Sequence, residues 1–353
     1  MFDDISESAL APATPLSTVT TLRLGGPAPR LVSATTDAQL IDAVRGAETF
    51  PLILGGGSNV VVADAGVAVP TILIRTRGVE SALVGDEAIV SVAAGEPWDE
   101  VVAAMCAAGL AGLECLSGIP GAAGATPIQN VGAYGQEVAE TIVAVRAFDR
   151  VADAVVTMTA EQCRFGYRGS VFKRSSRWVV LGVDFRLARS TLSAPVRYAE
   201  LAGRLGVAVG ERAPLADVRS AVLALRAGKG MVLDPADADT CSVGSFFVNP
   251  VLDAAAYQAL GVRLAGGEVR AWPMAGGGAK VSAAWLIEQS GFGRGFTLGG
   301  GVAVSGKHTL ALTNRGGGTT AALLELARHI RDGVHERFGV TLRPEPVLVN
   351  CEL

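Results

Sequence analysis

The chain has 353 residues, of which 50% are hydrophobic and 18% charged, and its net charge is −4. This length predicts roughly two or three domains of ~100–200 residues each, and an acidic chain without a basic block argues against a nucleic-acid partner. The five cysteines form no Cys-x-x-Cys pair, which predicts a reducing compartment, no disulfide framework and no metal site.

The beginning of the chain and its apolar runs indicate the compartment. The first residues, MFDDISESALAPA, are acidic where a secretory signal carries a basic segment. The longest compact apolar run, Val101–Leu113, is shorter than the roughly 20 residues that a helix needs to cross a bilayer. We therefore expect a cytoplasmic protein with no membrane insertion.

The stretch from the beginning of the chain to about position 190 predicts an α+β domain of mixed sheet and short helices. Short β-type runs at Leu31–Ala34 and Leu52–Leu54 flank an amphipathic helix at Asp37–Ala47, and Ile72–Ile74 completes a β-α-β opening. Further strands are expected at Ala88–Ala94, Ile142–Phe148 and Trp178–Leu187, with a helix at Pro97–Ala108 that begins at a proline and is stopped by Gly109.

The remainder of the chain predicts a second, more helical part. A helix at Pro214–Ala227 ends in Gly228-Lys229-Gly230, a candidate domain boundary. Later elements are a capped helix at Ser282–Ser290, a strand at Thr309–Thr313 and a long helix at Thr319–Phe338 that Gly339 stops.

Two glycine-rich stretches are the main candidates for ligand binding. Ser117–Gln136 (SGIPGAAGATPIQNVGAYGQ) excludes a continuous helix or buried strand, and its backbone N–H groups are able to face one anionic molecule. Gly55–Asn59 (GGGSN) follows a strand directly and resembles a pyrophosphate cradle. It lacks the third glycine of GxGxxG and the Walker lysine. An ordinary surface loop remains the alternative for Ser117–Gln136, and a plain strand-turn-strand for Gly55–Asn59.

Four other clusters combine reactive side chains with rigid residues. Taken singly, each has an ordinary explanation, namely a satisfied loop serine, a solvated arginine or a surface glutamate. They are Cys163–Phe172 (CRFGYRGSVF), Gly244–Pro250 (GSFFVNP), Ala283–Gly291 (AAWLIEQSG) and Leu342–Pro346 (LRPEP).

In series, these motifs resemble the UDP-N-acetylenolpyruvoylglucosamine reductase family, from TTLRLGG at Thr20–Gly26 to the terminal LRPEP. The resemblance implies a two-part FAD-binding module of the vanillyl-alcohol-oxidase (PCMH) type, followed by a smaller α+β substrate-binding domain. The implied boundaries are 1–75 and 76–229 for the FAD-binding subdomains (module 18–189), 230–340 for the substrate domain and 341–353 for a C-terminal catalytic segment. The segment around Tyr198 resembles the tyrosine loop of the longer subtype.

The resemblance also assigns site residues by position. Arg168, Ser245 and Glu345 fall on the catalytic positions. The positions implied for FAD are Gly55, Gly56, Gly57, Ser58, Asn59, Gly118, Ile119, Pro120, Gly121, Gly124, Ala125, Thr126, Gln129, Asn130, Gly132 and Val183. Those implied for the substrate are Tyr134, Tyr167, Tyr198, Lys229, Asn249 and Gln289. Val248 and Val347 depart from the family, where relatives often have Lys and some have Arg.

The implied chemistry is reduction of the enolpyruvyl ether of UDP-N-acetylglucosamine to UDP-N-acetylmuramate, with NADPH as co-substrate, for peptidoglycan precursors. NADPH and the sugar nucleotide would use one cavity in turn. We expect FAD to be non-covalent because the three histidines lie far from the flavin motifs in sequence. We also expect a monomer. The alternatives are an alcohol or lactone oxidase on the same module and a non-catalytic flavin-binding protein.

Overall fold

The computed structural model describes residues 13–264 and 267–353. Its contacts group the chain into two compact units. Unit 1 contains residues 13–14, 28–56 and 68–232, and unit 2 contains residues 15–27, 57–67, 233–264 and 267–353. Two short strands, β1 (Thr14–Pro15) and β2 (Pro27–Ala28), lie where the chain passes from one unit to the other.

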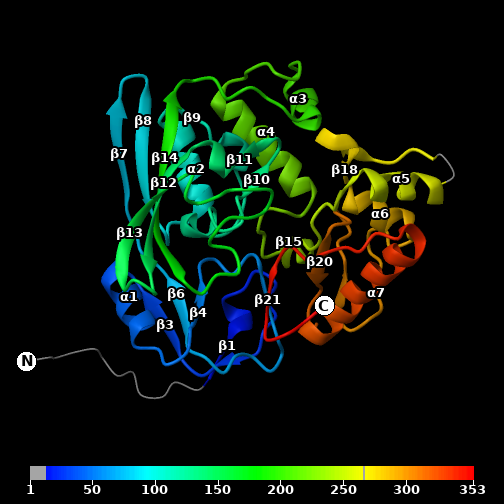
Figure 1. Ribbon diagram of the computed structural model, residues 1–353, viewed down its shortest axis with the longest axis horizontal. Coiled ribbons are helices and arrows are strands. Elements are labelled where there is room, and N and C mark those ends of the chain that lie inside the picture. Colours follow the sequence, from blue (N-terminus) through cyan, green and yellow to red (C-terminus); the bar gives the residue numbers. More distant parts are fainter. Residues whose placement is uncertain (1–12, 265–266) are drawn as a thin grey trace, which may run out of the picture. The chain divides into compact units, whose positions relative to one another are not determined.

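Unit 1 begins with a small parallel sheet in the order β3-β6-β4, covered by one helix (Figure 1). The helix starts at Thr36, whose side chain accepts a hydrogen bond from the N–H of Gln39, a standard N-cap. Leu40 and Val44, one turn apart, are buried in the core of the unit. The elements are β3 (Leu31–Ala34), α1 (Asp37–Arg45), β4 (Leu52–Leu54) and β6 (Thr71–Ile74).

The rest of unit 1 is built on a six-stranded antiparallel sheet in the order β13-β12-β14-β8-β7, with β9 paired to β14. Alternate side chains of β8 are buried, as expected of a sheet with one face on a core. The sheet strands are β7 (Val79–Val84), β8 (Glu87–Ala93), β9 (Leu110–Ala111), β12 (Ile142–Asp149), β13 (Ala154–Thr159) and β14 (Trp178–Arg189). The helices are α2 (Trp98–Ala107), α3 (Ala199–Leu205) and α4 (Leu215–Gly228). Short elements between them are η2 (Glu114–Leu116), η3 (Ala123–Ala125), β10 (Gly132–Ala133), β11 (Gln136–Glu137) and η4 (Val138–Glu140).

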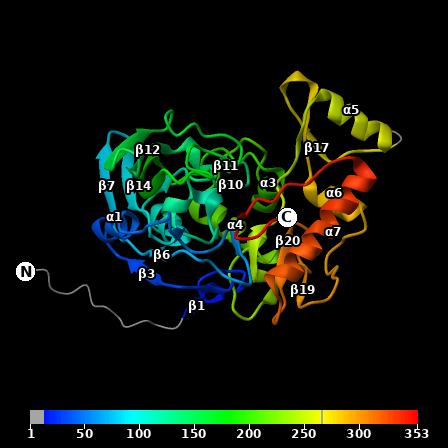
Figure 2. The same cartoon turned by 60° about the horizontal axis from the view of Figure 1, so that its bottom comes forward.

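Unit 2 combines three small sheets with three helices (Figure 2). The sheets have the orders β15-β20-β19, β16-β18-β17 and β21-β5, the last pair being parallel. The long helix α7 (Thr320–Phe338) buries Leu323, Ala327, Ile330 and Val334 along one stripe in the core of the unit. The other elements are η1 (Leu16–Thr18), β5 (Val60–Val62), η5 (Ala238–Thr240), β15 (Ser242–Ser245), β16 (Val251–Leu252), α5 (Ala254–Arg263), β17 (Ala271–Pro273), η6 (Ala275–Gly277), β18 (Ala279–Val281), α6 (Ala283–Gln289), β19 (Val302–Val304), β20 (Ala311–Asn314) and β21 (Val347–Val349).

The elements expected from sequence are present, with small shifts at their ends. Pro97 and Pro214 are the N-caps of α2 and α4, one position before the helical turn in which they were expected. The strand expected at Thr309–Thr313 begins at Ala311. Gly339 ends α7 in the left-handed conformation, with φ of 70°, as its position predicted. Within the described residues, no helix is long and apolar enough to cross a membrane.

Candidate active site

In unit 1, Gly55 and Gly56 of the first glycine-rich stretch contact the second. A Cβ on Gly56 would lie 2.7 Å from the Cα of Gly121, and one on Gly55 would lie 2.9 Å from the Cβ of Ala122. Real Cβ atoms do not approach backbone atoms this closely, so only glycine at position 56 allows this contact without a shift of the main chain. The loop after β4 and the Ser117–Gln136 loop therefore form one continuous glycine-lined surface.

Helix α2 and Ala94, the residue after strand β8, hold the Ser117–Gln136 loop by hydrogen bonds. The N–H of Trp98 donates to the carbonyl of Gly121 at 3.0 Å, and the N–H of Gly124 donates to the carbonyl of Ala94 at 2.9 Å. Asp99 accepts from the N–H of Gly118 at 2.6 Å. Among residues 13–264 and 267–353, the N–H groups of Ile119 and Gly121 have no protein acceptor. They are donors of the kind that hold a diphosphate, so the loop suits the phosphate-bearing part of FAD.

Several residues that were expected to bind FAD form hydrogen bonds or packing contacts within the protein. Asn130 is 2% exposed, and its side chain bonds the carboxylate of Glu137, the carbonyl of Gly166 and the N–H of Ala139. The hydroxyl of Thr126 donates to the carbonyl of Ala123 at 2.8 Å. Val183 lies inside β14, and its side chain is 1% exposed in the core of unit 1. Gly124 lies directly against Ala94, because a Cβ there would be 2.4 Å from the Ala94 Cβ. Their roles toward FAD stay predictions, and each has a visible structural role.

Arg168 is anchored to the far end of the same loop. Its guanidinium donates to the carbonyl of Gly132 at 2.7 Å and to that of Asn130 at 3.3 Å. The carboxylate of Glu137 lies 3.9 Å away, and the ring of Tyr167 lies 5.4 Å from the guanidinium carbon. The residue takes a positive φ of 53°, which is uncommon for a side chain of this size. Arg168 is thus held in one orientation by carbonyls of the glycine-rich loop.

The tyrosine loop also belongs to unit 1, where Tyr198 precedes α3. Its ring packs edge-on against Tyr134, with ring centroids 5.4 Å apart. The ammonium of Lys229, at the end of α4, lies 5.7 Å from the centre of the Tyr134 ring and 2.6 Å from the carboxylate of Glu200. Burial raises the pKa of Tyr134 to about 12. Three of the residues expected at the substrate therefore form one cluster.

In unit 2, a short backbone pairing joins the residues that follow Ser245 to the segment that carries Glu345. Ser245 is the last residue of β15, and the N–H of Glu345 donates to the carbonyl of Phe246 at 2.9 Å. The register of β15 shifts between Ser242 and Ser245, where Gly244 takes φ of 74°. Such a bulge reorients the side chain that follows it. Ser245 and Glu345 are both half-buried.

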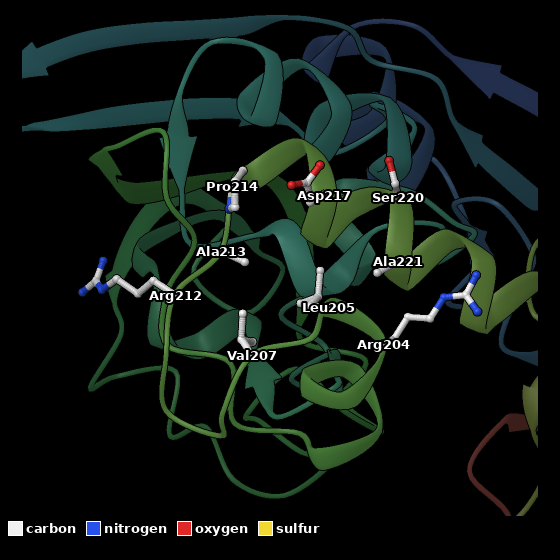
Figure 3. A pocket seen from close by; sticks show the side chains of 9 residues that line it. All are labelled: Arg204, Leu205, Val207, Arg212, Ala213, Pro214, Asp217, Ser220 and Ala221. Carbon is white, nitrogen blue, oxygen red and sulfur yellow. The ribbon is translucent and has the colours of Figure 1, made fainter.

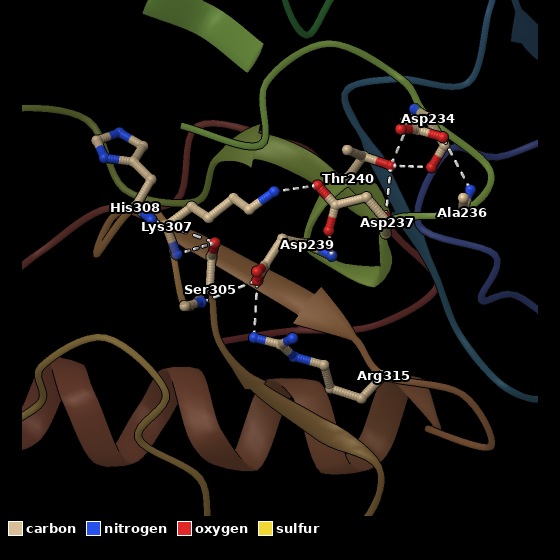
Figure 4. A network of polar contacts seen from close by, with 10 residues as sticks. Asp234, Ala236, Asp237, Asp239, Thr240, Ser305, Lys307, His308 and Arg315 are labelled. Atoms are coloured by element: carbon tan, nitrogen blue, oxygen red, sulfur yellow. Dashed lines mark hydrogen bonds and ion pairs between the residues drawn. The ribbon is translucent and has the colours of Figure 1, made fainter. Parts of the chain in front are cut away.

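A polar network fixes the chain that enters β15 (Figure 4). Asp239 is 7% exposed and accepts from the N–H of Gly306 at 2.8 Å and from Arg315 at 2.7 Å. The ammonium of Lys307 lies 2.6 Å from Asp237 and holds the pKa of that carboxyl below its usual value. Because β15 begins at Ser242, this network fixes the backbone that precedes the strand carrying Ser245.

The remaining predicted residues of unit 2 lie on two other segments. Asn249 accepts from the N–H of Ala283 at 2.9 Å and so caps the start of α6, while Gln289 is the last residue of that helix. The carbonyl of Asn59 accepts from the N–H of Val347 at 3.0 Å, so the end of the GGGSN stretch adjoins the segment that carries Glu345. Gly57 takes φ of 62°, and a Cβ there would lie 2.1 Å from the carbonyl oxygen of Val19.

A surface cavity of about 440 Å³ lies between α3 and α4, apart from these residues (Figure 3). Arg204 and Arg212 extend from opposite sides of it. Its lining is Arg204, Leu205, Val207, Arg212, Ala213, Pro214, Asp217, Ser220 and Ala221, none of which was expected at the site. In the described part of the chain, no group of three or more His, Cys, Asp or Glu side chains is placed to hold a metal ion.

Comparison with known proteins decides the family. A model of the FAD binding domain matches residues 28–158, and a model of the UDP-N-acetylenolpyruvoylglucosamine reductase C-terminal domain matches residues 234–349. The reductase of that name from Salinispora arenicola (strain CNS-205) is 60% identical over 345 residues, 96% of this chain and 95% of the relative. The chain belongs to the UDP-N-acetylenolpyruvoylglucosamine reductase family. A second relative of the same name, from Thermobifida fusca (strain YX), is 52% identical over 98% of this chain and 99% of its own length.

Membership in the family confirms the resemblance seen in the motifs and the expected fold. The crystal structure of the family's enzyme from Thermus caldophilus superposes with a TM-score of 0.65 at 26% identity, covering 96% of this chain and 98% of that one. The protein is therefore an FAD-dependent oxidoreductase with the expected two-part FAD module, and FAD is its cofactor.

Two residues of unit 1 that support the glycine loops were missed by sequence reasoning. Asp99 joins the N–H of Gly118 to the guanidinium of Arg219, to which it bonds twice, at 2.6 and 3.0 Å. Arg75 donates to the carbonyl of Gly55 at 2.9 Å, and burial lowers the pKa of its guanidinium. One sequence signal marks Asp99, an acid in the first turn of a helix. No such signal marks Arg75, one of many scattered arginines.

Proposed function

We propose that the chain catalyses the NADPH-dependent reduction of the enolpyruvyl ether of UDP-N-acetylglucosamine to UDP-N-acetylmuramate, in the cytoplasm and as a monomer. The product serves peptidoglycan precursor synthesis. The observation that supports this reaction best is the pairing of Ser245 with the Glu345 segment, through the 2.9 Å hydrogen bond from Glu345 N–H to the Phe246 carbonyl. A proton donor and an acid on adjacent backbone suit the reduction of a conjugated double bond, and they have no role in an alcohol or lactone oxidase.

The reaction delivers a hydride to the terminal carbon of the enol ether and a proton to its α-carbon. FAD, when bound, supplies the hydride that it takes from NADPH, chemistry that no side chain offers. Negative charge then develops on the α-carbon and spreads into the carboxylate of the substrate. The residues of this chain must stabilise that charge and supply the proton.

Arg168 is the candidate for stabilising the charge. Its carbonyl partners, Asn130 and Gly132, hold the fork of donors in one orientation before the substrate arrives. Glu345, where protonated, adds a further donor, and one preorganised donor of this kind contributes ~3–4 kcal/mol to transition-state stabilisation. Ser245 donates the proton to the α-carbon, because its hydroxyl is a weak acid that reacts usefully only with a strongly basic carbon.

The substrate-binding assignments suit an anionic, sugar-bearing ligand. Lys229 provides a cation, and Tyr134 and Tyr198 provide aromatic surface with hydroxyl groups beside it. Tyr167, Asn249 and Gln289 complete the proposed set, contributing a ring and two amides. Val248 stands where relatives often have Lys and Val347 where some have Arg, so both weaken the positive charge at the substrate side.

Anaerobic reduction of the purified protein by NADPH, followed by addition of the enolpyruvyl sugar nucleotide, tests the proposal. We expect the yellow colour to bleach with NADPH and to return with the substrate, with UDP-N-acetylmuramate formed in equal amount. Bleaching without reoxidation by this substrate would remove the proposed reaction while leaving a flavoprotein. Release of intact FAD on denaturation, rather than flavin that precipitates with the chain, tests the non-covalent attachment.

A further inference from the structure

Arg226, in the last turn of α4, carries a buried donor without a partner. The residue as a whole is half-buried, but its Nε atom is fully buried and forms no hydrogen bond within the described residues. Its Nη2 donates to the carbonyl of Met231 at 2.8 Å. Leaving a buried polar group unpaired costs roughly 1–3 kcal/mol, and more for a charged group. Such a group needs a reason to be retained.

Within the described residues, Arg226 also lacks an ion-pair partner, unlike the neighbouring arginine on the same helix. Arg219 lies two turns earlier and forms a two-pronged ion pair with Asp99 at 2.6 and 3.0 Å. Within the described residues, no carboxylate forms an ion pair with Arg226. Burial lowers the pKa of its guanidinium, against the opposing influence of Tyr134 and Asp99. An arginine still remains charged at neutral pH.

The surroundings of Arg226 are the residues already assigned to two diphosphate-bearing ligands. A Cβ on Gly118 would lie 3.4 Å from Nε, an ordinary contact distance, so the guanidinium adjoins the Ser117–Gln136 loop. Gly118 also takes φ of 71°, a conformation that favours glycine. Lys229 lies one turn further along the chain, over the ring of Tyr134.

We propose that Arg226 is an anion-binding residue that receives a diphosphate, either that of FAD or that of the sugar nucleotide. The sugar-nucleotide alternative rests on the proposed function, whereas the FAD alternative rests on the FAD-binding domain. The buried cation is unfavourable in the ligand-free protein and becomes favourable when the anion arrives. This differs from a structural arginine, which is paired before any ligand binds.

The test is Arg226→Met, which keeps an unbranched apolar stem and removes the charge and the donors. Arg204→Met is the matched control, since Arg204 is exposed on α3 and the change in net charge is the same. Two dissociation constants are measured for each variant by calorimetry: FAD with the flavin-stripped protein, and UDP with the FAD-loaded protein. The melting temperature of the flavin-stripped protein is measured as well.

We expect Arg226→Met to lower the affinity for one of the two ligands by ten- to a hundredfold. The melting temperature of the flavin-stripped protein should stay unchanged or rise. Weaker FAD binding alone identifies the flavin's diphosphate, and weaker UDP binding alone identifies that of the sugar nucleotide. Arg204→Met should change neither. Arg226→Lys, which retains the charge but not Nε, should recover part of the loss.

Two results would overturn the assignment. If Arg226→Met binds both ligands with wild-type affinity, the role of Arg226 is limited to its hydrogen bond to the Met231 carbonyl. A lower melting temperature with a parallel loss of both affinities would show a structural role for the turn. If the wild-type protein binds no UDP, the FAD measurement alone decides. A wild-type protein that binds FAD but fails to reduce the enolpyruvyl substrate disproves the reaction without touching Arg226.

Discussion

At the scale of single residues, Ser245 separates the two halves of the proposed reaction. Reduction of the flavin by NADPH needs no proton on carbon, so Ser245→Ala should still bleach at nearly the wild-type rate. Reoxidation by the enolpyruvyl substrate needs that proton, and loss of a positioned general acid costs typically ~10²–10⁴-fold in rate. Stopped-flow absorbance of each half checks this, and Ser245→Cys should recover part of the second rate. Equal slowing of both halves would make Ser245 a structural residue.

Gly56 tests the contact between the two glycine loops. Alanine there would place its Cβ 2.7 Å from the Cα of Gly121, so one main chain must move. Overpacking of this kind costs about 1–3 kcal/mol. We expect FAD affinity to fall at least tenfold, measured by flavin fluorescence. Gly261→Ala is the control, because a Cβ on that helical glycine meets nothing within 4 Å. Unchanged FAD affinity in Gly56→Ala would show that the loops do not need this approach.

The residue scale is also where sequence reasoning reached its limit. The order of the motifs along the chain is specific, and it assigned Arg168, Ser245 and Glu345 to catalytic positions, an assignment that stays a prediction. The motifs did not distinguish a polar residue that faces a ligand from one that its own loop satisfies, as Asn130 shows. Nor did they distinguish Arg226 from the other arginines, since burial and the lack of a partner depend on distant packing.

At the scale of elements, Asp99 connects helix α2, the Ser117–Gln136 loop and α4. Burial alone would raise the pKa of its carboxyl, but the hydrogen bonds from Arg219 and Gly118 and the charges of Arg219 and Arg226 outweigh it and lower the pKa. Because its pKa is lower in the folded state, Asp99 stabilises the fold fully at pH values above its unfolded-state pKa of about 3.9. This stabilisation is lost as the pH falls below that value and through the folded-state pKa. We therefore expect FAD affinity to weaken below about pH 4.

Asp99→Asn checks this anchor. It should weaken FAD binding already at neutral pH, because the ion pair with Arg219 is lost, and it should flatten the change in affinity between about pH 5 and pH 3. Flavin fluorescence across this pH range in both proteins measures the effect. A variant with wild-type affinity at neutral pH and the same acid profile would assign the acid sensitivity to other carboxyl groups.

Element prediction succeeded where the hydrophobic period was long and the ends were marked. Thr319 and Gly339 delimit α7, and Ser282 caps α6 through the N–H of Trp285. The short strands β3, β4 and β6 were predicted because turn residues bound them, but β21 was not. Strand β21 follows Pro346 directly, and it exists because it pairs in parallel with β5, which lies near the beginning of the chain. So short a run has no period of its own, and only its distant partner defines it.

At the scale of the whole molecule, unit 2 is assembled from segments far apart in the chain. Leu22, Leu24 and Val61, from its two N-terminal segments, are at most 5% exposed in its core. The hydroxyl of Thr21 donates to the carbonyl of Ser242 at 2.6 Å, and the N–H of Thr320 donates to Asp64 at 2.7 Å. The C-terminal part of the chain therefore lacks part of its core when it is separated from the beginning.

This arrangement predicts that a fragment of residues 233–353 does not form a cooperative fold. It would lose three buried side chains, each contributing about 1.5–3 kcal/mol, against a total domain stability of about 5–15 kcal/mol. It would also expose the edge of β21 that β5 covers. Proton NMR of the fragment should show poor dispersion, with binding of a hydrophobic dye and no sharp thermal transition. The full-length chain, prepared in parallel, should show a cooperative transition and little dye binding. A well-dispersed spectrum from the fragment would mean that the core of unit 2 forms without residues 15–27 and 57–67.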